Sequence, residues 1–309
     1  MPSLWKFGGM TPFRLAQAAL KKMGDDELST RSAALSYYFL LAVFPLFLFL
    51  LSLVGLVAGE HSQLRESIIS GLGKMAPGSA SELVQSTINQ TLKSSGGVKL
   101  VAGIVGALWA ASSGMGAVIV SLNVIYSVKE SRPWWKQRLT AVGLTAALAG
   151  LIIVAITIVL YGGKIGDAVA AHIGLSMAFQ IAWKIIQWPL SLGAMFLSFS
   201  ILYYFGPNVE HRKWFWVTPG AAIGVALWLL ASIGFRIYLH FFNSYSATYG
   251  SLGAAIILIL WLYITGFTVL MGGEVNAMIE NADKEMAAFE EKKRKIQSKL
   301  SQNQLMKAA

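Results

Sequence analysis

Three ionisable side chains lie inside long apolar segments of this sequence of 309 residues, Lys184, Arg236 and Glu274, and Arg31 directly precedes the first such segment. A charged group inside a lipid bilayer is costly, so such residues commonly mark a binding site or a pathway. A lysine or arginine near a helix end has a simpler explanation, because its long side chain can reach the lipid head groups. If Lys184 and Arg236 act together instead, they form a site for a phosphate or another anion.

Arg31 and Glu274 suggest a contact between the two ends of the apolar region. Arg31 precedes the first apolar segment and Glu274 lies near the end of the last one, so both charges are expected at one membrane depth. We predict that the guanidinium pairs with the carboxylate, with Asn276 and Asn123 donating further hydrogen bonds. In the alternative, each charged group points separately into the head-group layer.

No catalytic constellation is visible in the sequence. The chain has no cysteine, which excludes thiolate metal sites and cysteine nucleophiles. A metal-dependent nuclease needs clustered ligands, whereas His61, His172, His211 and His240 are isolated from one another. The sequence also has no Walker loop and no G-x-S-x-G elbow. We therefore expect no enzyme activity, no metal, no cofactor and no nucleic-acid partner.

The elements that would position these residues are membrane-spanning helices. Hydrophobic residues make up 55% of the sequence and charged residues 13%, whereas soluble domains are about one quarter charged. About 20 apolar residues cross the hydrocarbon core at 1.5 Å per residue. We predict an all-α integral membrane protein with six transmembrane helices. The spans are expected at about 32–58, 99–126, 139–160, 179–205, 219–239 and 251–278.

Three further segments surround this bundle. Residues 1–31 are polar and basic, and Thr11 followed by Pro12 is typical of a helix start, so we expect an amphipathic helix on the cytoplasmic membrane surface. Residues 59–98 are expected to form a small helical extracytoplasmic excursion, which is a lid, a docking site or only packing. Residues 279–309 form a basic cytoplasmic tail, expected to be helical and then disordered past Ser298.

The distribution of lysine and arginine predicts the orientation. One side of the six-span topology is rich in them: Lys6, Arg14, Lys21, Lys22, Arg31, Lys129, Arg132, Lys136, Arg138, Arg212 and Lys213. The other side has fewer: Arg65, Lys74, Lys93, Lys99 and Lys164. By the positive-inside rule, both termini are cytoplasmic. The net charge of +10 then serves mainly to attract anionic lipid of the inner leaflet.

Three segments carry a family resemblance. RSAALSYYFLLAVFPL at 31–46, LWAASSGMGAVIVSLNVIY at 108–126 and YGSLGAAIILILWLYITGFTVLMGGEVNA at 249–277 resemble the YihY/BrkB family of bacterial inner-membrane proteins. The resemblance covers nearly the whole membrane region and implies a six-helix protein of the inner membrane. Members have carried the labels ribonuclease, virulence or serum-resistance factor, and transporter. The absence of a metal or nucleophile constellation argues against the ribonuclease label here.

Two functions remain open from the sequence. The first is transport or translocation of a small ion, an anionic solute or a phospholipid, which the ionisable residues within spans favour. The second is a non-catalytic structural or assembly role in the bacterial envelope, in which the bundle only anchors the loops. The sequence does not identify a substrate, a direction or a protein partner.

Overall fold

The computed structural model describes residues 4–58, 97–173, 177–209, 214–241 and 244–308, which form helices joined by short turns without a strand. The helices are η1 (Leu4–Gly9), α1 (Pro12–Asp25), α2 (Leu28–Ala58), α5 (Gly97–Ile125), α6 (Trp134–Ile173), α7 (Met177–Phe205), α8 (Pro219–Phe241) and α9 (Ser244–Ala308). The predicted all-α class is confirmed for these residues. The excursion predicted at 59–98 lies almost entirely outside them.

Five helices of the described part are long and apolar enough to cross a membrane. These candidate spans are Gly103–Ile125, Trp134–Ala155, Ile185–Phe205, Pro219–His240 and Ala255–Asp283. They coincide with the second to the sixth predicted spans. α2 is a helix of 31 residues at the place of the first predicted span, but it is not among the five, so a sixth span stays a prediction.

Two helices continue further than the sequence suggests. α6 runs through Gly162, Gly163 and Gly166 to Ile173, although the third span was expected to end near residue 160. α9 continues as one helix to Ala308, whereas disorder was expected past Ser298. Residues 274–308 contain neither glycine nor proline, and Glu290 lies four residues before Arg294, a spacing that supports a helix.

Two helix starts follow the expected capping chemistry. The side chain of Thr11 accepts a hydrogen bond from the backbone N–H of Arg14 at 3.4 Å, and Pro12 is the first residue of α1. Thr218 does the same for the N–H of Ala221 at 3.1 Å, just before Pro219 begins α8. Both side chains satisfy an N–H group that has no partner within its own helix.

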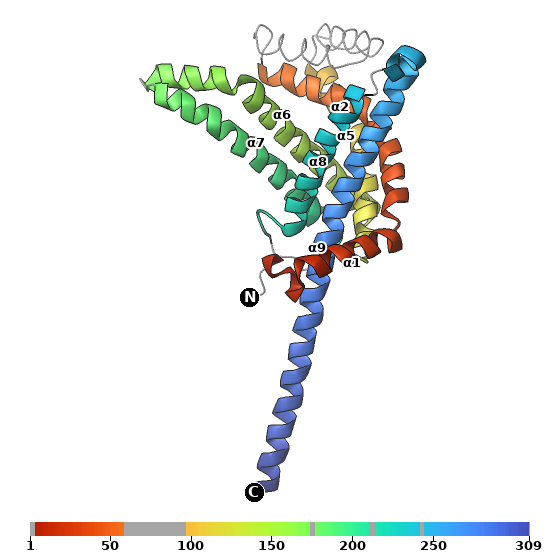
Figure 1. Cartoon of the computed structure of the whole chain (residues 1–309), viewed down its shortest axis with the longest axis vertical. Helices are drawn as coiled ribbons and strands as arrows, with labels where there is room; N and C mark the ends of the chain where they lie inside the picture. Colours follow the sequence, from red (N-terminus) through yellow and green to blue (C-terminus); the bar gives the residue numbers. More distant parts are fainter. Residues whose placement is uncertain (1–3, 59–96, 174–176, 210–213, 242–243, 309) are drawn as a thin grey trace.

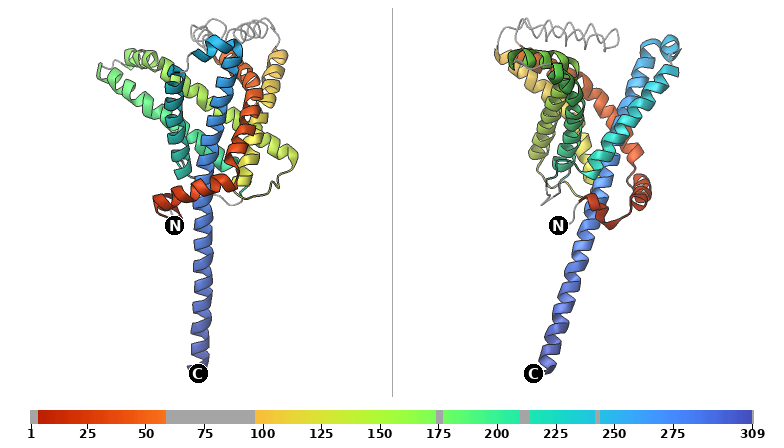
Figure 2. Two further views of the ribbon diagram at one scale, coloured as in Figure 1. Left: turned by 45° about the vertical axis from the view of Figure 1, so that its right-hand side comes forward. Right: turned by 60° about the vertical axis from the view of Figure 1, so that its left-hand side comes forward.

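The helices form two groups that separate along the bundle. α8 and α9 pack against each other, while α2, α5, α6 and α7 form a second group through the contacts of α2 with α5, α5 with α6, and α6 with α7. α2 also packs extensively against α9, so it lies between the two groups. The groups meet where α1 lies across α9 (Figure 1) and diverge toward the opposite end (Figure 2). We call the end next to α1 the hub end and the opposite end the far end.

The apolar core lies at the hub end. Its buried residues come from α1, the last turns of α5 and α7, the first turns of α2, α6 and α8, and the middle of α9. They include Leu28, Ile119, Leu122, Leu202, Tyr203, Ala221 and Leu270. Apolar residues described nearer the far end are commonly exposed, such as Trp188 and Leu230. The packed core of the described residues therefore joins the two helix groups at the hub end.

Candidate functional site at the hub end

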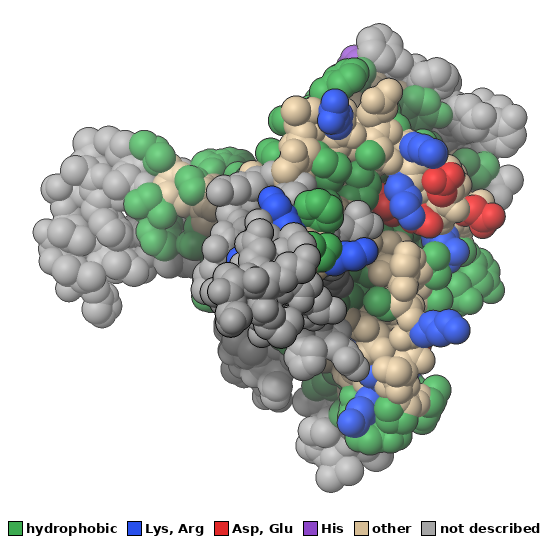
Figure 3. Space-filling model, turned by 90° about the horizontal axis from the view of Figure 1, so that it is seen from below, with side chains coloured by type: hydrophobic (Ala, Val, Ile, Leu, Met, Phe, Trp, Pro, Cys, Tyr) green, Lys and Arg blue, Asp and Glu red, His purple; other side chains and the backbone are tan. Residues whose placement is uncertain are grey.

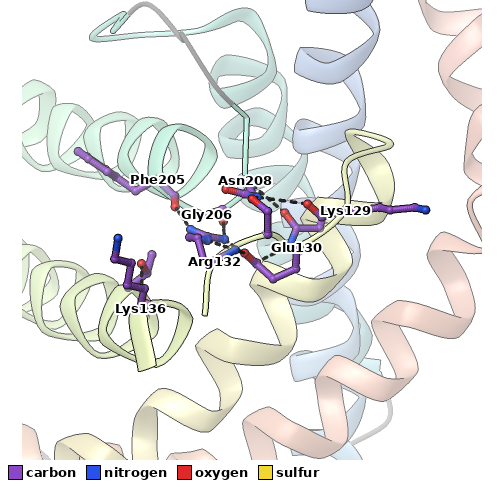
Figure 4. Close-up of polar contacts among 10 residues, drawn as sticks. Lys129, Glu130, Arg132, Lys136, Phe205, Gly206 and Asn208 are labelled. Carbon is purple, nitrogen blue, oxygen red and sulfur yellow. Dashed lines mark hydrogen bonds and ion pairs between the residues drawn. The ribbon is translucent and has the colours of Figure 1, made fainter. Parts of the chain in front are cut away.

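A polar network joins the turn that follows α5 to the turn that follows α7 (Figure 4). Asn123 is its centre. Its Nδ2 donates to Glu130 Oε2 at 2.8 Å, and its Oδ1 accepts the backbone N–H of Asn208 at 2.7 Å. The Nδ2 of Asn208 donates in turn to Ser131 Oγ at 2.7 Å and to the Lys129 carbonyl at 3.2 Å. We call Asn123, Glu130, Arg132, Gly206 and Asn208 the loop lock.

Arg132 connects the loop lock to the end of α7. Its Nε and Nη2 donate to the two oxygens of Glu130, each at 2.8 Å, which gives a bidentate ion pair. The same guanidinium donates to the carbonyls of Phe205 at 3.3 Å and Gly206 at 2.9 Å. These contacts satisfy carbonyls at a helix C-terminus, where a cation is also favoured by the helix dipole.

The electrostatics of Glu130 follow from this geometry. The hydrogen bonds from the Arg132 side chain hold the pKa of Glu130 below its ordinary value of 4.5. Partial burial acts in the opposite direction, and the hydrogen bond from Asn123 adds to the lowering. Glu130 is therefore charged at neutral pH, and the loop lock is fully formed there.

A second polar contact joins α9 to the start of α8. Asn276 is buried, its Oδ1 accepts the N–H of Gly220 at 2.8 Å, and its Nδ2 donates to Thr218 Oγ1 at 2.8 Å. The two backbones approach so closely that a methyl group on Gly220 would collide with the carbonyl oxygen of Gly272. Only glycine fits at this crossing.

Glu274 lies one turn before that contact with only 1% of its surface exposed. No N–H or O–H group of the described residues donates to its Oε2 atom. The charged groups whose field acts on it come from α1 and the turn after it: Asp26, Lys22 and Asp25. Nearby, Tyr203 of α7 donates its hydroxyl to the Val269 carbonyl of α9 at 2.7 Å. The hub end thus buries an acidic group among packed helices.

The structure does not bring Arg31 and Glu274 into an ion pair within the described part of the chain. The Nε of Arg31 donates to the Asp26 carbonyl at 2.9 Å, because the turn between α1 and α2 places that oxygen beside it. Asn276 binds the start of α8 and Asn123 binds the loop lock, so neither of these amides donates to Glu274. Asp26, which sequence reasoning missed, is among the charged residues whose field acts on Glu274.

The predicted anion site of Lys184 and Arg236 stays a prediction. Arg236 is exposed on α8, and the side chain of Lys184 on α7 lies outside the described residues. The parts of α7 and α8 that carry these residues belong to the diverging groups (Figure 2).

The fold and the buried polar hub define a multi-pass, all-helical membrane protein. The chain belongs to the family described as Virulence factor BrkB, whose model matches residues 19–297. The resemblance inferred from its three segments is thereby confirmed.

The relatives are named mainly as membrane proteins. The chain is 37% identical over 258 residues to the protein YfkH of Bacillus subtilis (strain 168), whose name describes it as ribonuclease-like; the match covers 84% of this chain and 92% of that protein. It is 28% identical over 274 residues to a UPF0761 membrane protein of Vibrio campbellii, covering 85% and 81% of the two chains. It is 26% identical over 269 residues to a UPF0761 membrane protein of Ralstonia nicotianae, and this match covers 86% of this chain and 58% of that protein. No solved structure matches the chain.

The comparisons place the chain in no known enzyme class. The family is one of membrane proteins, and the ribonuclease-like name is said of the Bacillus relative. No group of three or more histidine, cysteine, aspartate or glutamate side chains suited to a metal occurs within the described ranges.

We expect the loop lock to lose stability in acid through Glu130. Because the folded-state pKa of Glu130 is lowered, its contribution is complete above the unfolded value of 4.5 and is lost as the pH falls through the folded value. Glu130→Gln should lower stability at neutral pH by about 1 kcal/mol, given the partial exposure of the pair. The difference from the parent should shrink below about pH 4.5.

Thermal unfolding in detergent between neutral and acidic pH measures this difference. Glu27→Gln, which removes an exposed carboxylate outside the loop lock, is the matched control. A stability difference between Glu130→Gln and the parent that is the same at every pH would contradict the role of the ionised carboxylate.

Proposed function

We propose that the protein transports or translocates a small ion, an anionic solute or a phospholipid across the bacterial inner membrane. One observation carries this proposal: α8 and α9 join the group of α2, α5, α6 and α7 at the hub end and diverge from it toward the far end (Figure 2). Two helix groups that are fastened at one end are able to rock against each other. Rocking of one bundle against another is a common basis of alternating access in transporters.

The distribution of packing supports this interpretation. At the hub end, the backbones of α8 and α9 touch at Gly220 and Gly272, and Tyr203 bonds α7 to α9. Toward the far end, Ile186 on α7 and Ile237 on α8 are exposed. Helices that serve only as an anchor gain van der Waals contact by packing along their whole length. Separation of the groups is instead useful to a protein that opens and closes.

The buried acid adds a second argument. An ionisable residue enclosed between membrane helices usually belongs to a pathway or a coupling site, because burying it is costly. Glu274 is buried at the hub end, where the two groups meet, so it would lie near the pivot of the proposed rocking motion.

The full topology forms part of the proposal. We take α2 as the sixth span, which puts both termini on one side and residues 59–98 on the other. Lysine and arginine side chains are spread over the hub face, while acidic side chains gather in one place (Figure 3). By the positive-inside rule, this face is cytoplasmic.

The same face is suited to anionic lipid of the inner leaflet. α1 exposes Phe13 and Leu20 together with Arg14, an amphipathic combination that suits the membrane interface. Lys136 lies over the ring of Trp135 at 5.4 Å at the start of α6, where an interfacial aromatic belt is expected. Lipid binding at this face would orient the hub in the membrane.

The alternative is a structural or assembly role in the envelope. Its support is the long extension of α9 beyond the hub end, which exposes Phe289 and Ile296 seven residues apart on one helix face. Such a stripe suits a partner helix, although two positions are few for a coiled coil.

Reconstituted vesicles test the transport proposal. We expect protein-containing vesicles to exceed protein-free vesicles in one of three assays: ion flux, uptake of an organic anion, or scrambling of a fluorescent phospholipid. Gly220→Ala should reduce that activity, because the added methyl forces α8 from α9 at a cost of about 1–3 kcal/mol. Gly234→Ala, on the same helix with no atom within 4 Å of the added methyl, is the matched control. If protein-containing vesicles do not exceed protein-free vesicles in any of the three assays, the result would favour the assembly role.

Cysteine labelling tests the topology against a background free of native cysteine. In intact cells, Lys136→Cys and Asn281→Cys should resist a membrane-impermeant thiol reagent, because both exposed positions lie at the hub face. Ser86→Cys, in the segment proposed to be extracytoplasmic, should react. Labelling of Lys136→Cys from outside would reverse the orientation.

A further inference from the structure

Arg138 places a positive charge beside the middle of α5. Its Nη2 donates to the Trp109 carbonyl, and its Cζ lies 4.5 Å from the centre of the Trp109 ring. Trp109 is near the middle of α5, and the two residues belong to the candidate spans Gly103–Ile125 and Trp134–Ala155. The sequence predicts Arg138 just outside the third span, whereas the structure includes it in α6. The guanidinium therefore lies against a candidate membrane span and not in a loop.

The turn after α5 leads the chain back along that helix. Glu130 contacts Asn123 near the end of α5, and Arg138, farther along the chain, contacts Trp109. Trp134, at the start of α6, stands edge-on to Trp109 with the ring centroids 6.4 Å apart. One guanidinium and two tryptophan rings from two packed helices are thus held together. We call Arg138, Trp109 and Trp134 the Arg138 cluster.

The Arg138 cluster carries a charge that the described chain does not neutralise. Arg138 takes part in neither of the ion pairs found among the described residues. Its Nε–H finds no acceptor there, and the hydrogen bond to the Trp109 carbonyl leaves further N–H groups of the guanidinium for a ligand. Arginine stays charged, and a charged arginine beside lipid without a counterion is unfavourable. The chemistry of the cluster calls for an anion from outside the described chain.

The surroundings of the guanidinium suit the phosphate of a lipid. Trp109 and Trp134 are 46% and 71% exposed, so a ligand can reach the cluster from the lipid side. The surface around it is apolar, since Val105 on α5 and Leu139 on α6 are also exposed. A soluble anion would have to leave water to reach this surface, whereas a phospholipid packs its own chains against it. A guanidinium also matches a phosphate with two parallel hydrogen bonds.

We propose that Arg138 binds the phosphate of an anionic phospholipid beside Trp109 and Trp134. A head group held near the middle of α5 has left the membrane surface and rests part of the way across the span. The inference rests on the proposed transport function in one respect, because it names phospholipid as the class of molecule that is moved. The binding site itself stands on the contacts of the Arg138 cluster.

Native mass spectrometry of the purified full-length protein tests the binding, with phosphatidylglycerol as the probe. The parent should retain one more lipid than Arg138→Gln, whose affinity should be lower by about tenfold or more. Arg294→Gln removes an exposed arginine on α9 beyond the hub end and, as the matched control, should bind like the parent. Equal retention by the parent and Arg138→Gln would overturn the proposal.

A second variant covers the case in which Arg138→Gln does not fold. Arg138→Lys keeps the charge but loses the two parallel hydrogen bonds, so it should bind phosphatidylglycerol several-fold more weakly than the parent. Binding equal to that of the parent would contradict the role of the guanidinium.

The same experiment separates a phospholipid from other occupants. Inorganic phosphate should not displace phosphatidylglycerol, and diacylglycerol, which lacks the phosphate, should bind equally to the parent and to Arg138→Gln. Displacement by inorganic phosphate would show a site for a soluble anion. A change from dimer to monomer in Arg138→Gln without loss of lipid would show that a second copy of the chain covers the cluster. Either of these two results would overturn the proposal.

A distance measurement locates the bound head group. Ala110→Cys, an exposed position next to Trp109 in a chain without native cysteine, carries one spin label, and a sparse phospholipid labelled on its head group carries the other. In vesicles the parent background should show a short-distance population that is lost in Arg138→Gln. Long distances alone in the parent would place the head groups at the membrane surfaces and overturn the proposal.

The two proposals fail separately, because neither measurement needs transport. Binding at Arg138 without any lipid scrambling would leave the site and contradict the transport of phospholipid. Scrambling that is undiminished while no lipid binds at Arg138 would leave the proposed function and remove the site.

Discussion

The structure depends on satisfying the helix ends at the hub without help from lipid. Each backbone N–H or C=O group that is exposed to hydrocarbon without a hydrogen-bond partner destabilises the protein by roughly several kcal/mol. Two side chains meet this requirement: Arg132 donates to the carbonyls at the end of α7, and Asn276 accepts the N–H of Gly220 at the start of α8. Asn208 donates to Ser131 and so joins the two loops. Because these bonds join different helices, they also fix how the helices meet.

This arrangement concentrates rigidity at one end. Satisfied polar contacts and the close approach of Gly220 to Gly272 leave the hub little freedom, whereas the far parts of the two helix groups diverge from each other (Figure 2). Helical hydrogen bonds are internal, so a helix can tilt as a rigid body without exposing its backbone. A fixed hub with diverging helix groups suits the proposed transport function, in which the groups rock about the hub.

The sequence could predict the helices but not the partners of the polar side chains. Apolar length located five spans, and the threonine and proline pairs located two helix starts. The expected membrane depth of the two residues led to the prediction that Arg31 pairs with Glu274. Depth alone does not define in which direction a side chain points around its helix. Asp26 comes near Glu274 because the turn between α1 and α2 folds back toward α9. Asn123 binds Glu130 because the turn that follows α5 folds back onto the end of that helix. The Glu-x-Arg spacing of Glu130 and Arg132, and Asn208 directly after a Gly-Pro pair, were the available signals.

The central claim is that two helix groups move about a fixed hub, and distance measurements between spin labels test it most directly. Labels at Ile186→Cys on α7 and Ile237→Cys on α8, both exposed toward the far end, report on the arms. Labels at Lys136→Cys and Asn281→Cys report on the hub. In lipid nanodiscs, the account predicts a broad or two-peaked distance distribution for the first pair and one narrow peak for the second. A single narrow peak for both pairs under all conditions would contradict it.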